Sequence, residues 1–116
     1  MINTRNRFRT ENDPDMLNWN TITRQRLVDA FLTLRTPDHV RSFLDDLLTT
    51  NELDTCARRL DAANWMLLGA PYEAITEATG LSPKVIARIS KRLVNKRGGF
   101  NQVMQRLHPR GMHYTE

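Results

Sequence analysis

The side chains best suited to chemistry are cations, and they are concentrated near the C-terminal end of the chain. Residues 70–116 carry eight Lys or Arg against three acids, a net charge of +5, whereas residues 1–69 carry nine Arg against ten acids. No acid occurs between Glu77 and Glu116. Guanidinium and ammonium groups bind phosphates and base edges, so the distribution favours a polyanion as partner. Most basic runs are nevertheless solvated faces, so charge alone does not establish nucleic-acid binding.

A tight turn at Gly80-Leu81-Ser82 gives these cations a structural context. Gly80 can adopt the left-handed conformation that ends a helix, and Ser82 followed by Pro83 is typical of the start of the next one. Two short helices joined in this way form a helix-turn-helix, whose second helix enters the major groove of DNA. An ordinary helical hairpin explains the apolar positions equally well, but it does not explain a second helix with four cations and no acid.

The two faces of this predicted second helix differ in chemistry. Ile86 and Ile89 are expected to pack inward together with Ile75 and Leu81. The outer face is expected to bind DNA, since Arg and Lys suit guanine edges and phosphates, while Val and Ala can contact thymine methyl groups. The predicted base contacts are Lys84, Val85, Ala87 and Arg88. The predicted phosphate contacts are the helix start at Ser82 and the side chains of Lys91, Arg92, Lys96 and Arg97.

No other group of residues has the spacing of a catalytic, cofactor or metal site. The three histidines and the lone Cys56 are scattered along the chain, and Cys56 occupies an apolar helical position where a core residue is expected. Asp45 and Asp46 are adjacent and would point about 100° apart on a helix, so they are expected to face solvent rather than to act as a pair. The sequence therefore predicts no enzyme, no cofactor and no metal.

The elements that position the cationic face are all predicted to be helices. Apolar residues recur at helical spacing from Thr21 onward, with Leu27, Phe31 and Leu34 in one stripe, and no segment alternates as a strand would. Caps and breakers divide the chain into about six helices, the later ones spanning about 36–48, 50–68, 71–79, 82–95 and, after a break at Gly98-Gly99, 100–107. We expect a flexible arm at 1–19, one helical domain at 20–107 with its helix-turn-helix at 71–95, and a loose tail at 108–116.

Length and composition limit the remaining possibilities. The 116 residues fit one domain, and a helical chain this short often gains core by dimerising. The chain has no continuous apolar run of about 20 residues, so no membrane-spanning helix is predicted. The first residues are basic but lack the apolar stretch of a signal peptide, and the single cysteine permits no intrachain disulfide. The cytoplasm is therefore the expected location.

A wider set of residues links the turn to the helices before it. Its strongest parts are Leu48-Thr49-Thr50-Asn51-Glu52-Leu53, Arg58-Arg59-Leu60, and the run from Tyr72 through Gly80 to Ala87-Arg88. With these residues the chain resembles the Trp repressor superfamily, and most closely its YerC/YecD-type Trp-repressor-related branch. The resemblance implies an all-α intertwined homodimer with two recognition helices about one DNA turn, roughly 34 Å, apart on a palindromic operator. The implied dimer core is Leu27, Phe31, Phe43, Leu47 and Leu60.

The resemblance also implies an effector pocket, with two departures. The Trp repressor binds tryptophan with two arginines that correspond to Arg59 and Arg88, and Thr49 matches a threonine at the pocket edge. Ile89 stands where the repressor has glycine and should fill the space for the indole ring. Arg92 replaces a serine that meets the ligand's amino group and should repel an ammonium. Tryptophan is therefore not expected as the effector, and a different ligand or none is favoured.

Arg59 and Arg88 also permit a role without a ligand. Each could form a salt bridge with Asp61 or Glu52, or could contact a phosphate. Both alternatives remain open at the level of the sequence.

Three functions are compatible with these patterns. The first is a dimeric, sequence-specific regulator, a repressor, that binds double-stranded DNA. The second is a helical dimer that binds an acidic protein partner through its basic face, as a protein-interaction module. The third is an RNA-binding protein, which would prefer structured RNA to duplex DNA.

Overall fold

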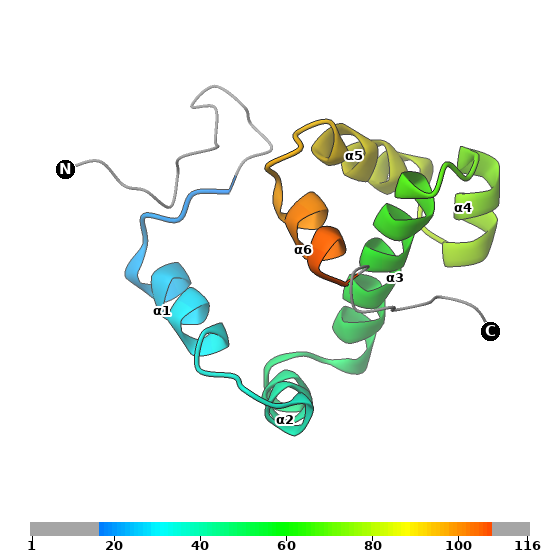
Figure 1. Cartoon of the computed structure of the whole chain (residues 1–116). Helices are drawn as coiled ribbons and strands as arrows, with labels where there is room; N and C mark the ends of the chain where they lie inside the picture. The colour runs from blue at the N-terminus through cyan, green and yellow to red at the C-terminus, as the bar shows by residue number, and fades with distance from the viewer. Residues whose placement is uncertain (1–16, 108–116) are drawn as a thin grey trace. The chain divides into compact units, whose positions relative to one another are not determined.

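Six α-helices and no strand make up residues 17–107, the part of the chain that the computed structural model describes (Figure 1). The helices are α1 (Ile22–Phe31), α2 (Pro37–Leu47), α3 (Thr50–Leu67), α4 (Tyr72–Thr79), α5 (Pro83–Leu93) and α6 (Gly99–Leu107). The all-α prediction is therefore confirmed. The predicted arm as far as residue 16 and the predicted tail at 108–116 lie outside the described residues.

The helices fall into two units, one that ends at Leu47 and one that begins at Leu48. In the first unit, the Thr21 hydroxyl accepts from the backbone N–H of Arg24 and begins α1, and the Thr36 hydroxyl accepts from the N–H of His39 and begins α2. The rings of Phe31 and Phe43 meet edge to face with centroids 5.3 Å apart. Neither α1 nor α2 contains a buried residue.

The second unit is organised around α3, which packs against α4, α5 and α6 (Figure 1). α3 begins with a capping box: the Thr49 hydroxyl accepts from the Glu52 N–H at 3.2 Å, and the Glu52 carboxylate accepts from the Thr49 N–H at 2.9 Å. The helix ends before Gly69, as predicted, because Gly69 takes a left-handed φ of 86°. Caps that the sequence predicts therefore fix both ends of the central helix.

The core of the second unit lies where these four helices meet. Ala62 and Ala63 on α3 are fully buried, and their small side chains allow the neighbouring helices to approach closely. The other buried apolar residues are Ile75, Leu81, Ile86, Ile89, Leu93 and Met104. Five of these eight belong to the predicted helix-turn-helix, so folding of the unit fixes the relative position of α4 and α5.

The structure corrects three details of the predicted elements. Leu34 lies beyond α1, because the Thr33 hydroxyl donates to the Ala30 carbonyl at 2.7 Å in a turn that ends the helix. α5 ends at Leu93 rather than Asn95, because the Asn101 side chain donates to the carbonyls of Leu93 and Asn95. The prediction of Cys56 as a core residue is wrong for the single chain, because this part of α3 lies beyond the core residues and leaves the thiol exposed.

Candidate nucleic-acid interface

The turn between α4 and α5 has the geometry that the sequence predicts. Gly80 takes a left-handed φ of 70°, and its N–H donates to the Thr76 carbonyl at 2.9 Å. The neighbouring Thr79 is buried, and its hydroxyl donates to the Ile75 carbonyl at 2.7 Å while accepting from the Leu81 N–H at 3.3 Å. Sequence analysis missed Thr79, although a threonine four residues after a buried isoleucine was a signal that its hydroxyl needs a local partner.

α5 begins immediately after this turn. The Ser82 hydroxyl accepts from the Val85 N–H at 3.3 Å, and Pro83 occupies the first turn, where its missing N–H costs no hydrogen bond. The prediction of Ser82 as the N-cap is confirmed. The capping bond leaves Ser82 itself exposed at the start of the helix.

The inner face of α5 is buried as predicted, and the outer face is cationic. Ile86 and Ile89 are each 1% exposed, and Leu93 is also buried. On the other face Lys84, Ala87, Arg88 and Lys91 are exposed, while Val85 and Arg92 are half-buried. A helix with this division has only its positive face available to a partner.

The cations on this surface differ in their internal contacts. Among residues 17–107, the side chains of Lys84, Arg88 and Lys96 make no hydrogen bond or ion pair, whereas Lys91, Arg92 and Arg97 each have a partner. Arg59 likewise forms no salt bridge with Asp61 or Glu52 within this range, so the first alternative for Arg59 and Arg88 finds no support there. The Glu52 carboxylate instead binds Thr49, and hydrogen bonds from the Thr49 backbone and side chain hold the pKa of Glu52 below its usual value.

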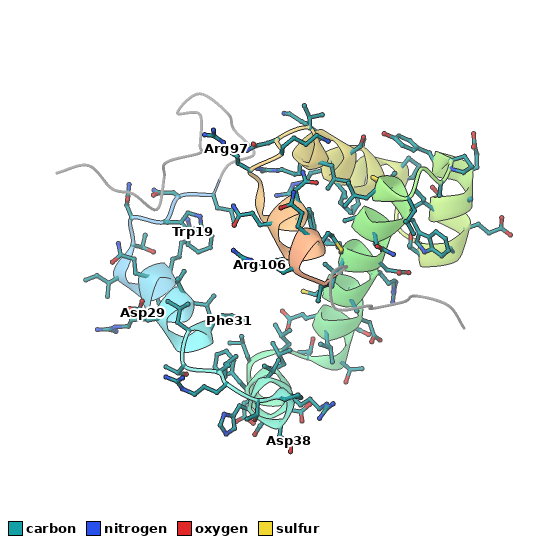
Figure 2. All side chains as sticks on the ribbon, viewed as in Figure 1. Trp19, Asp29, Phe31, Asp38, Arg97 and Arg106 are labelled. Atoms are coloured by element: carbon teal, nitrogen blue, oxygen red, sulfur yellow. The ribbon has the colours of Figure 1, made fainter. Side chains whose placement is uncertain are left out.

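Lys96 and Arg97 lie in the turn that connects α5 to α6, and both are exposed. Figure 2 shows Arg97 extending outward from this turn. The α5 helix ends two residues earlier than predicted because the buried Asn101 side chain donates to the carbonyls of Leu93 and Asn95, at 3.0 and 2.9 Å. Sequence analysis missed Asn101; its only signal was a polar residue within the apolar stripe of α6.

Two of the predicted effector residues, Thr49 and Arg59, lie far apart within one chain. Thr49, the N-cap of α3, and Arg59 are ten residues apart, which corresponds to roughly 15 Å along the helix axis. Ile89 is buried in the core and Arg92 is half-buried. A single chain therefore does not bring Thr49 to Arg59.

A separate hollow of about 290 Å³ lies at the junction of α3, α4 and α5. Tyr72 and Ser90 on its wall are joined by a hydrogen bond between their hydroxyls. The other lining residues are Met66, Leu67, Ala70, Leu93, Val94 and Lys96, so the hollow contains none of the predicted effector residues.

Residues 17–107 contain neither a metal-ligand cluster nor a membrane-spanning helix. No three His, Cys, Asp or Glu side chains gather there as metal ligands would. No helix in that part of the chain combines the length and apolar character needed to cross a bilayer.

The fold and the surface together define a helix-turn-helix protein. Residues 22–108 match the family model described as Trp repressor protein. A protein called YerC from Bacillus subtilis (strain 168), itself uncharacterized, is 29% identical over 82 residues, which cover 71% of this chain and 79% of that protein. The crystal structure of a TrpR-like protein from Eubacterium eligens ATCC 27750 matches with a TM-score of 0.68 and 30% identity, covering 78% of this chain and 93% of that one.

The chain belongs to the Trp repressor protein family. The family is one of DNA-binding regulators rather than of enzymes, and the chain shares its all-α, helix-turn-helix fold.

Proposed function

We propose that the protein is a dimeric, sequence-specific transcription repressor that binds a palindromic operator in double-stranded DNA. One observation carries the proposal: α5 follows a left-handed turn, buries Ile86 and Ile89, and presents four cations and no acid on its remaining surface. A helical hairpin that served only packing would not need this segregation of charge. We expect the activity in the cytoplasm, because both relatives come from bacteria, where chromosomal DNA lies in that compartment.

The contacts divide by position along the helix. The N-terminal half of a recognition helix enters the major groove, so Lys84, Val85, Ala87 and Arg88 contact bases. Residues nearer the end of the helix, and those beyond it, contact the sugar-phosphate backbone, which fixes orientation without specifying sequence. These are Lys91, Arg92, Lys96 and Arg97. Ser82 places the exposed N–H groups of the α5 N-terminus where a phosphate can approach.

The apolar surface of the first unit supports the dimer. Leu27, Phe31 and Leu47 are 38%, 44% and 42% exposed, although their helical spacing is that of a core. Contiguous exposed apolar surface often marks a protein–protein interface. A second copy of the chain would cover them, as the family fold implies, and would bring two recognition helices to one operator with two-fold symmetry.

Tryptophan is not the effector in this proposal. Ile89 is packed in the core and occupies the position where the Trp repressor has the glycine that leaves room for the indole ring. Arg92 adds a positive charge where the ligand's ammonium would lie. We expect that 1 mM tryptophan changes the affinity for the operator by less than twofold; a tenfold increase would contradict this part of the proposal.

The test of DNA binding is affinity for duplex DNA as a function of salt. The logarithm of the association constant should fall linearly with the logarithm of salt concentration, with a slope of about −0.9 for each phosphate neutralised. Lys84→Ala should change the preferred sequence, whereas Lys96→Ala should weaken all sequences alike. Weak, salt-independent binding would contradict the function. Uniform weakening by both variants would contradict the assignment of base contacts.

A further inference from the structure

The turn between α5 and α6 is held by hydrogen bonds at nearly every residue. The N–H groups of Val94 and Asn95 donate to carbonyls three residues earlier, each at 3.3 Å, so the end of α5 tightens into a 3₁₀-like turn. The Gly98 N–H donates to the Asn95 carbonyl at 2.9 Å. The Arg97 N–H donates to the Asn95 side chain at 3.0 Å, and the Gln102 side chain donates to the Arg97 carbonyl at 2.6 Å. The backbone that carries Lys96 and Arg97 is therefore fixed although both side chains are exposed.

Asn101 is the centre of this network. Its side chain is 6% exposed, and its amide nitrogen donates both protons, one to the Leu93 carbonyl and one to the Asn95 carbonyl. Carbonyls at the end of a helix lack partners within the helix and must be satisfied by other groups. Asn101 lies on α6, close to the fully buried Met104, so it joins the end of α5 to the core of the second unit. A buried amide with both protons used specifies one geometry of the turn.

Gly98 supports the same geometry by close approach. A Cβ added at Gly98 would lie 3.0 Å from the Asn95 carbonyl oxygen and 3.4 Å from that of Arg92. At the neighbouring Gly99 an added Cβ meets nothing within 4 Å. The two glycines therefore offer a matched pair, in which only the first substitution must shift the turn.

We propose that Asn101 is a positioning residue for DNA binding, which fixes the α5–α6 turn so that Lys96 and Arg97 meet two backbone phosphates at a set distance from the recognition helix. The inference rests on the proposed function and adds a residue that does not itself touch DNA. A phosphate contact made from an ordered backbone pays less entropy on binding than one made from a mobile loop. Backbone contacts carry no sequence information of their own, so the fixed turn is expected to affect affinity rather than sequence preference.

The first test is the salt dependence of duplex binding by Asn101→Leu, which keeps the approximate volume and removes both donors. We expect binding roughly 3- to 10-fold weaker and a salt slope smaller by about 0.9–1.8, which corresponds to one or two lost phosphate contacts. The preferred sequence should not change. Met104→Ala, a core change on the same helix that leaves the turn's hydrogen bonds in place, should lower thermal stability while the salt slope stays as in the wild type.

A double-mutant cycle separates action through the turn from general damage. In the Lys96→Ala/Arg97→Ala background, Asn101→Leu should weaken binding by less than about twofold, because the contacts that it positions are already absent. If Asn101→Leu proves unfolded by circular dichroism, Gly98→Ala takes its place and should lower the slope in the same way. Gly99→Ala should leave the slope unchanged.

The outcomes distinguish this inference from the function on which it rests. A wild-type chain without salt-dependent duplex binding overturns both. If the wild type binds normally but the salt slope is unchanged in Asn101→Leu, only the role of Asn101 is overturned. The same holds if Asn101→Leu weakens DNA binding equally in the wild-type and double-alanine backgrounds.

Discussion

Gly80→Ala should destabilise the fold, and the cost should come from the backbone alone. Gly80 has a left-handed φ of 70°, yet a Cβ added there would meet nothing within 4 Å. The strain of placing alanine in this conformation is about 1–2 kcal/mol. Alanine also restricts the unfolded chain, which by itself raises the free energy of unfolding by about 0.4–1 kcal/mol. The net loss is therefore expected to be about 1 kcal/mol.

Gly99→Ala is the matched control, because Gly99 also has open space around its Cα but no left-handed φ. Gly99→Ala should restrict the unfolded chain in the same way without straining the folded one. The free energies of unfolding of the two variants should therefore differ by about 1–2 kcal/mol. Urea unfolding followed by circular dichroism measures this difference. With a denaturant slope of about 2 kcal/mol per molar, the midpoints should differ by about 0.5–1 M. If the two midpoints agree within error, the left-handed turn that positions α5 is not present in solution.

Three further predictions concern the caps and the core. Ser82→Ala removes the acceptor for the Val85 N–H and should lower the free energy of unfolding by about 1 kcal/mol, measured by urea unfolding; an unchanged midpoint would show that α5 does not depend on this cap. Ile89→Ala removes a side chain that is 1% exposed and should cost about 2–5 kcal/mol, and a smaller loss in the same assay would mean that Ile89 is not packed in the core. Hydrogen bonds to Thr49 lower the pKa of Glu52 below its usual value of 4.5. The ionised carboxylate therefore stabilises the fold above pH 4.5, and this stabilisation is lost as the pH falls through the lowered pKa. The wild type should therefore lose stability relative to Glu52→Gln between about pH 6 and pH 3 in thermal melts, and parallel pH profiles would refute the capping role.

Features set by local chemistry could be predicted from the sequence. Thr49 and Ser82 begin helices and Gly80 ends one because each acts on backbone groups a few residues away. Ile86 and Ile89 are buried as their spacing predicts, since helical periodicity alone places them on one face. The fold class and the cationic surface of α5 follow from the same local rules.

Features set by distant contacts could not be predicted. α5 ends at Leu93 because the Asn101 side chain, eight residues later and on another helix, donates a hydrogen bond to the Leu93 carbonyl. No local sequence pattern predicts that bond. The exposure of Cys56 depends on what packs against the first half of α3, which the periodicity of the α3 sequence does not specify. The sequence resemblance likewise groups Thr49 with Arg59, although the two residues lie well apart in a single chain.

Selection of bound duplexes from a random pool tests the central claim most directly. A dimer with two recognition helices predicts enrichment of a palindrome whose half-sites are about one helical turn, roughly 34 Å, apart. Lys84→Ala should shift the enriched half-site, while Lys96→Ala should retain it at lower yield. Enrichment of no sequence, or of a single site without two-fold symmetry, would contradict the account of a dimeric, sequence-specific DNA-binding protein.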